Sequence, residues 1–142
     1  MKTAPLIEPP KTEIEALFGP VIYAYTRRQA LEDGFQVAVG SLAREAGFKY
    51  PVFLTRRVWD ECVKVPPGME GWQDENGRLW DVLHMTRLAA SQADGDTIRV
   101  QLYVQKHARR RRPEMVELRA VCCATDIDNP EPCICIMFPE ES

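Results

Sequence analysis

The chain has 142 residues, of which 45% are hydrophobic and 27% charged, and its formal net charge is −3. This length and composition are typical of one ordinary globular domain that buries a hydrophobic core. A small negative charge argues against a protein that coats nucleic acid or anionic membrane with its whole surface. The charge is uneven, because residues 1–20 sum to −1, residues 21–125 to +3 and residues 126–142 to −5.

The sequence contains no run of about 18 apolar residues, so we expect no transmembrane helix and no membrane partner. Prolines interrupt the first ten residues, and the charged-then-apolar pattern of a secretory signal is missing. We therefore expect a cytoplasmic protein whose five cysteines are reduced.

We expect a proline-rich arm over residues 1–20 and a single α+β domain over residues 21–142. The domain begins with short helices and extended segments. A capping box at Thr26 to Gln29 predicts a helix that ends at Gly34. Alternation and capping signals then predict strands over 35–39 and 51–54 and helices over 42–46 and 56–63.

One long amphipathic helix is predicted over residues 74–91, with Asp74 or Asn76 as its N-cap. Its apolar side chains recur every three or four residues: Leu79, Val82, Leu83, Thr86, Ala89 and Ala90. Three apolar segments at 98–105, 115–123 and 133–138 predict a C-terminal three-stranded antiparallel meander. The last segment is apolar on both sides, which indicates a central or covered strand. We expect the long helix to pack across the apolar face of this sheet.

A candidate anion site lies at the start of the first helix, at Thr26, Arg27 and Arg28. Arginines in a first turn oppose the helix dipole, so their presence suggests a bound anion such as phosphate. The same Thr-Arg-Arg sequence recurs at residues 55–57. The alternative is that these arginines pair with carboxylates one or two turns along the same helices.

A second candidate lies on the long helix, where Trp80, His84, Arg87 and Ser91 form a stripe opposite the apolar face. An indole, an imidazole and a guanidinium on one stripe would bind an anionic or aromatic ligand. The alternative is that Trp80 edges into the core while the other side chains are solvated.

Four consecutive arginines, Arg109, Arg110, Arg111 and Arg112, are predicted at the tip of a hairpin. Such a tip would contact a nucleic-acid backbone. It would equally contact an acidic protein, or the acidic end of a second copy in a homodimer. A solvated basic loop is the default interpretation.

We expect no metal site and no cofactor. Adjacent strand residues point to opposite faces, so at most three of Cys122, Cys123, Cys133 and Cys135 share one side. Their spacing also differs from that of zinc knuckles, and core packing of free thiols is the expected role. No catalytic motif is present, so the chain is more typical of a binding protein than of an enzyme, and we assign no catalytic residue.

Six segments occur in a specific order along most of residues 21–141: Tyr25–Gly34, Ala43–Phe48, Pro51–Thr55, Val58–Trp59, Gly77–Leu83 and Ile136–Glu141. In this order they resemble a family of small uncharacterised bacterial proteins that are often carried on plasmids and phages. The resemblance implies a bacterial cytoplasmic accessory protein of a mobile element. It implies no known activity and therefore no catalytic residues.

The leading functional hypothesis is a non-enzymatic binding module for a protein or an anionic, phosphate-bearing ligand. Its ligand-binding residues would be Thr26, Arg27, Arg28, Trp80, His84 and Arg87. The first alternative is nucleic-acid binding through the Arg109–Arg112 tip. The second is a small enzyme acting on a nucleotide-like compound, which would need His84 beside a carboxylate or thiol.

Overall fold

A computed structural model describes residues 26–93, 95, 97–108 and 112–141. Its helices and a five-stranded mixed sheet form an α+β fold, so this part of the prediction is confirmed. The sheet order is β1-β2-β5-β4-β3, with one parallel pair, β2 with β5. The predicted arm, residues 1–20, and Arg109 to Arg111 lie outside the described residues.

The first half of the domain consists of short elements, as the sequence predicted. They are α2 (Arg27–Glu32), β1 (Gln36–Ala38), α3 (Gly40–Glu45), β2 (Val52–Thr55), α4 (Arg56–Val58) and η2 (Trp59–Val63). The second half contains α5 (Glu75–Ser91), β3 (Thr97–Val104), β4 (Glu114–Asp126) and β5 (Asn129–Met137). A π-helical turn, η2, continues α4, so the helix predicted over 56–63 is present but not α-helical throughout.

The structure corrects the predicted three-stranded C-terminal meander. The sheet that contains β3, β4 and β5 has five strands and is mixed. β5 pairs antiparallel with β4 on one edge and parallel with β2 on the other, with Val52 opposite Ile134. A strand that is apolar on both faces is favoured in the interior of a sheet, and pairing with β2 as well as β4 places β5 there.

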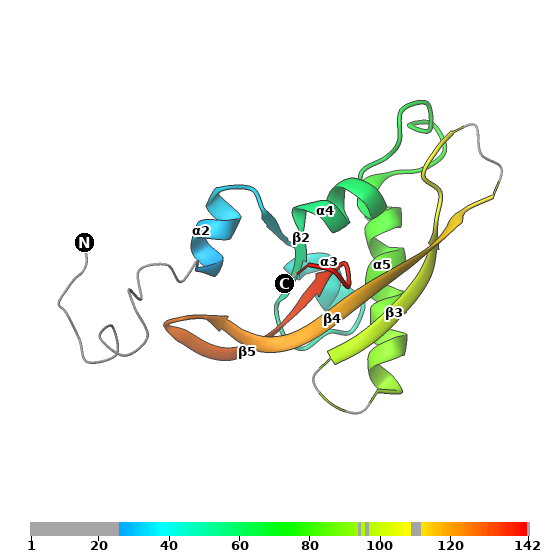
Figure 1. Ribbon diagram of the computed structural model, residues 1–142. Helices are drawn as coiled ribbons and strands as arrows, with labels where there is room; N and C mark the ends of the chain where they lie inside the picture. Colours follow the sequence, from blue (N-terminus) through cyan, green and yellow to red (C-terminus); the bar gives the residue numbers. More distant parts are fainter. Residues whose placement is uncertain (1–25, 94, 96, 109–111, 142) are drawn as a thin grey trace.

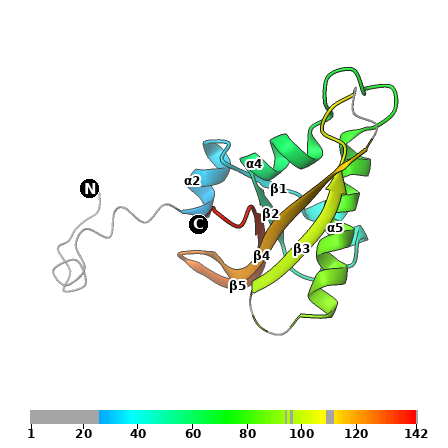
Figure 2. The ribbon, with the colours of Figure 1, turned by 45° about the vertical axis from the view of Figure 1, so that its right-hand side comes forward.

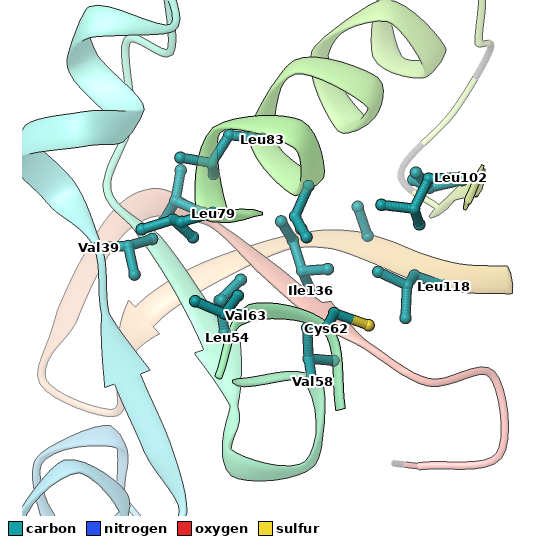
Figure 3. Close-up of a cluster of buried hydrophobic side chains, with 14 of the residues drawn as sticks. Val39, Leu54, Val58, Cys62, Val63, Leu79, Leu83, Leu102, Leu118 and Ile136 are labelled. Atoms are coloured by element: carbon teal, nitrogen blue, oxygen red, sulfur yellow. The ribbon is translucent and has the colours of Figure 1, made fainter. Parts of the chain in front are cut away.

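The long helix, α5, packs on one face of the sheet together with α3, α4 and η2 (Figure 1). The Asp74 side chain caps it by accepting a hydrogen bond from the Gly77 N–H at 2.7 Å. In Figure 3, Leu79 and Leu83 of α5 face Ile136 and Leu118 of the sheet. The main core therefore lies between α5 and one face of the sheet.

The opposite face of the sheet carries a second, smaller core of Phe53, Cys133, Cys135 and Met137. Leu31 of α2 packs against it. Because successive strand residues alternate between faces, β5 contributes to both cores. Figures 1 and 2 show α2 beside the turn that joins β4 to β5, away from α5.

Among the described residues, no helix has the length and apolar character needed to span a membrane.

Truncation of the fully buried Leu83 to alanine should lower the free energy of unfolding by about 2–5 kcal/mol, because it removes transfer energy and leaves a cavity against the sheet. Leu88 lies on the exposed side of the same helix and is the matched control. Leu88→Ala should change stability by no more than about 0.5 kcal/mol. Urea unfolding of both variants measures the difference, and equal losses would contradict the placement of α5.

Candidate functional site

The start of α2 has the capping box that the sequence predicted. Thr26 Oγ1 accepts from the Gln29 N–H at 3.0 Å, and the Gln29 side chain accepts from the Thr26 N–H at 3.0 Å. The next two backbone amides, of Arg27 and Arg28, donate to the carboxylate of Asp126 at 3.1 and 3.0 Å. A carboxylate of the same chain thus occupies the place where an external anion was predicted.

The Asp126 carboxylate is well matched to this position. Hydrogen bonds from the backbone N–H groups of Ile127, Arg28 and Arg27 hold its pKa below the usual 3.8. Asp128, two residues on, lies 3.7 Å from the Arg28 guanidinium in an exposed ion pair. The turn between β4 and β5 therefore binds the start of α2 through charge.

The second Thr-Arg-Arg segment, at the start of α4, is also neutralised within the chain. Arg57 donates to Glu61 at 2.8 Å and to Glu140 at 2.7 Å, and its guanidinium lies 4.0 Å from the centre of the Phe138 ring. Arg56 forms a 3.9 Å ion pair with Asp60. This is the pairing with neighbouring carboxylates that the sequence left open as the alternative.

Thr55 caps α4 by accepting from the Val58 N–H at 3.3 Å, and its hydroxyl donates to Glu141 at 2.8 Å. Glu141 also accepts from the Phe138 N–H at 2.9 Å. The acidic C-terminal segment thus supplies carboxylates to both helix starts. Binding of an external anion by Thr26, Arg27 and Arg28 stays a prediction, and an incoming anion would compete with Asp126.

The Arg27 side chain points into the second core rather than to solvent. Its guanidinium lies 4.3 Å from the centre of the Phe53 ring and donates to Cys135 Sγ at 3.2 Å and Cys133 Sγ at 3.3 Å. Cys123 Sγ lies 3.7 Å from Nη2. Three thiols therefore share one side of the sheet, the maximum that strand geometry allowed.

The predicted stripe on α5 is present, with the Trp80 and His84 rings stacked at 6.2 Å between centroids. The Arg87 guanidinium covers Gly47 at the end of α3, where an added Cβ would lie 2.7 Å from its Cζ atom. Ser91 donates to the Leu88 carbonyl of its own helix. The structure does not bring this stripe together with Arg27 and Arg28, which lie across the sheet on α2 (Figure 2).

Arg78, which is not among the predicted site residues, lies in the first turn of α5 and is only 6% exposed. It donates to the backbone carbonyls of Val63 and Gln105 at 3.1 and 2.8 Å and to the Gln73 side chain at 2.6 Å. Within the described part of the chain it forms no ion pair, and its buried Nη2 atom has no hydrogen-bond partner. Burial lowers the pKa of Arg78, which Cys62 and Asp81 only partly offset.

Arg78 is one of the residues that line an open hollow of about 640 Å³ at the start of α5. Two exposed indoles line it, Trp72 with 76% and Trp80 with 38% of its surface exposed. Its other lining residues are Glu70, Gly71, Gln73, Asp74, Gly77 and Asp81. The lining of the hollow therefore combines aromatic surface, three carboxylates and the Arg78 side chain.

Two signals in the sequence point to this hollow. Arg78 precedes Val82 by four residues and so falls on the apolar face of the helix, where a guanidinium is out of place. Trp72 lies in a polar loop after Pro66-Pro67-Gly68, where nothing local buries an indole. Neither signal shows that the loop and the helix start enclose one space.

Two further predictions concern the arginines of the hairpin tip and the thiols of the sheet. Of the four arginines at the hairpin tip, Arg112 is described and exposed. Within the described residues, no cluster of three or more His, Cys, Asp or Glu side chains has the arrangement of a metal site. At the thiols of β4 and β5 the Arg27 guanidinium, itself a cation, contacts all three sulfur atoms.

Replacing Asp126 with asparagine should destabilise the protein at neutral pH, because it removes the negative charge at the start of α2. The folded-state pKa is lowered, so the contribution is present above the unfolded pKa and is lost as pH falls through the folded one. The stability difference from the wild type should stay constant down to about pH 5 and shrink below pH 3.8. Thermal melts across this range measure it, with Asp128→Asn as the control; a difference that grows on acidification would contradict the assignment.

The chain was compared with protein families, curated proteins and solved structures. No curated protein and no solved structure matches it. Residues 16–142 match a family of unknown function, which agrees with the uncharacterised family that the sequence resembled. The chain therefore belongs to the family of unknown function DUF6573.

Proposed function

We propose that the protein is a non-catalytic binding module whose hollow at the start of α5 takes a basic side chain of a protein partner. The observation that carries this proposal is that Trp72, Trp80 and Arg78 line one hollow, and that the Nη2 atom of Arg78 is buried without an acceptor among the described residues. The sequence hypothesis named a protein or an anionic ligand as the partner. This proposal keeps the protein partner and keeps Trp80 as a binding residue.

The two indoles support a macromolecular partner. Exposed tryptophan is costly in water, and it is one of the residues that most often dominate the energy of protein interfaces. Three quarters of the Trp72 surface is exposed in the part of the chain that the structure describes. The faces of Trp72 and Trp80 also attract cations through their π systems.

The charge of the hollow favours a basic group over an anion. Its lining holds three carboxylates, Glu70, Asp74 and Asp81, and one guanidinium, Arg78. Glu70 accepts from the Gly68 N–H and Asp74 caps α5, so both carboxylates are held at the rim. A lysine or arginine side chain would meet an attractive field there, whereas a phosphate would be repelled.

Arg78 adds a requirement for an acceptor. A buried donor without a partner costs about 1–3 kcal/mol, which an incoming oxygen atom would recover. A peptide supplies such an oxygen in its backbone carbonyl, next to the basic side chain and without a negative charge. A segment of polypeptide therefore satisfies the aromatic, electrostatic and hydrogen-bonding features together.

The other hypotheses remain proposals with less support. An anionic ligand at α2 would have to displace Asp126. Nucleic-acid binding through Arg109 to Arg112 rests on residues of which three lie outside the described part. A cytoplasmic location, a bacterial mobile element, a homodimer and an enzymatic role rest on the sequence alone.

Short peptides that differ only in a central Lys, Arg, Glu or Ala residue test the proposal. The indole N–H signals of the three tryptophans in ¹⁵N-labelled protein provide the readout. Lys and Arg peptides should shift the Trp72 and Trp80 signals saturably and leave that of Trp59 nearly unchanged, because Trp59 packs against the main core. Trp72→Ala should weaken binding about tenfold or more.

Ile127→Ala is the matched control, since Ile127 is also a largely exposed hydrophobic residue but lies in the turn between β4 and β5 (Figure 1). This variant should bind the Lys peptide as the wild type does. Equal shifts from Glu and Lys peptides, or no saturable shift from any of them, would refute a site for basic side chains.

A further inference from the structure

We propose that Cys123 and Cys133 form a reversible disulfide when the protein meets a hydroperoxide, which makes the tip of the β4–β5 hairpin a site of oxidative modification. The proposal concerns the second core and is independent of the hollow at the start of α5. It rests on the register of two strands and on which thiol is open to solvent.

The two cysteines lie directly opposite each other in the antiparallel β4–β5 pair. Directly opposed residues have Cα atoms about 4.5–5.5 Å apart, which is within the range that a disulfide spans. Their Sγ atoms are 3.8 Å apart. Rotation of the two side chains is therefore enough to bring the sulfur atoms to bonding distance, without a change in strand pairing.

No other thiol of the described chain has this relation to a partner. Cys122 is exposed but points to the other face and lies opposite Ile134. Cys135 lies opposite Val121, and Cys62 is buried in the main core. The register thus selects one pair from the five cysteines.

The two thiols differ in their exposure to solvent, and this difference determines which of them reacts first with the oxidant. Cys123 is exposed and is the sulfur that a hydroperoxide reaches, while Cys133 is fully buried. Burial raises the pKa of Cys133 to about 11, although the Arg27 guanidinium acts in the opposite direction. Cys123 is therefore the attacking thiol and Cys133 the resolving one.

The reaction balances with hydrogen peroxide as the oxidant. The Cys123 thiolate attacks one peroxide oxygen, the O–O bond breaks, and a sulfenic acid and hydroxide form. Cys133 sulfur then attacks Cys123 sulfur, the S–O bond breaks, and the departing hydroxide takes up the Cys133 proton. Two thiols lose two electrons and two protons, and both peroxide oxygens leave as water.

Arg27 lies at the centre of this site. Its Nη2 atom is 3.3 Å from Cys133 Sγ and 3.7 Å from Cys123 Sγ, so the guanidinium contacts both sulfur atoms of the pair. The same residue donates its backbone N–H to Asp126. Oxidation would thus take place where α2 is bound to the hairpin.

The intact mass of the full-length protein after brief treatment with hydrogen peroxide tests the proposal. The wild type should lose two hydrogen atoms and regain them with dithiothreitol. Cleavage by a protease specific for aspartate, at Asp126 or Asp128, should leave two flanking peptides joined by a disulfide, one with Cys122 and Cys123 and the other with Cys133 and Cys135. This second readout needs no substitution of the buried Cys133.

Cys123→Ser should abolish the loss of hydrogen, whereas the matched variant Cys122→Ser, which changes the adjacent exposed thiol, should retain it. The proposal is overturned if Cys123→Ser still loses two hydrogen atoms, or if the wild type only gains oxygen. A disulfide-linked dimer as the main product, or an unchanged mass when free cysteine is oxidised in parallel, overturns it equally.

Discussion

The insertion of β5 between β2 and β4 is the constraint on which the rest of this fold depends. Its parallel pairing with β2 is the only strand contact in the described residues that joins the first half of the chain to the second. Because β5 is apolar on both faces, it contributes Ile136 to the main core and Cys133 to the smaller one. Both of its ends then continue into acidic residues, so Asp126 reaches the start of α2 and Glu140 reaches that of α4.

This arrangement divides the charged residues into two groups. At α2 and α4, arginines that oppose the helix dipole are neutralised by carboxylates of the same chain, which lowers the need for an external anion. At the start of α5 the buried arginine is not compensated in this way. One of the Arg78 donors has no acceptor in the described part of the chain. Our proposal is that a bound peptide relieves this cost beside the exposed indoles of Trp72 and Trp80.

The sequence predicted those features that depend on interactions between residues close together in the chain. The capping box at Thr26, the cap of α5 at Asp74 and the doubly apolar character of β5 were all readable, because each depends on residues within one turn or one strand. The parallel β2–β5 pair could not be predicted, since its partners lie about eighty residues apart and neither segment contains a signal that identifies the other as its neighbour. Long-range contacts also limit what can be predicted about the sites. The arginines of α2 were identified from the sequence, but the contact of Asp126 with the start of α2 depends on that long-range strand pairing. The hollow depends on a loop and a helix start meeting in space.

The most direct test of the binding site is the guanidinium signal of Arg78 in ¹⁵N-labelled protein, recorded with and without the lysine peptide. A buried guanidinium exchanges slowly with water, so its Nη signals are resolvable from those of the exposed arginines. If a peptide carbonyl completes its hydrogen bonds, the Nη2 signal shifts and exchanges more slowly as the peptide saturates. An Arg78 signal that stays unchanged while the peptide is bound would contradict the account, because the buried donor would then be a feature of the fold and not of the site.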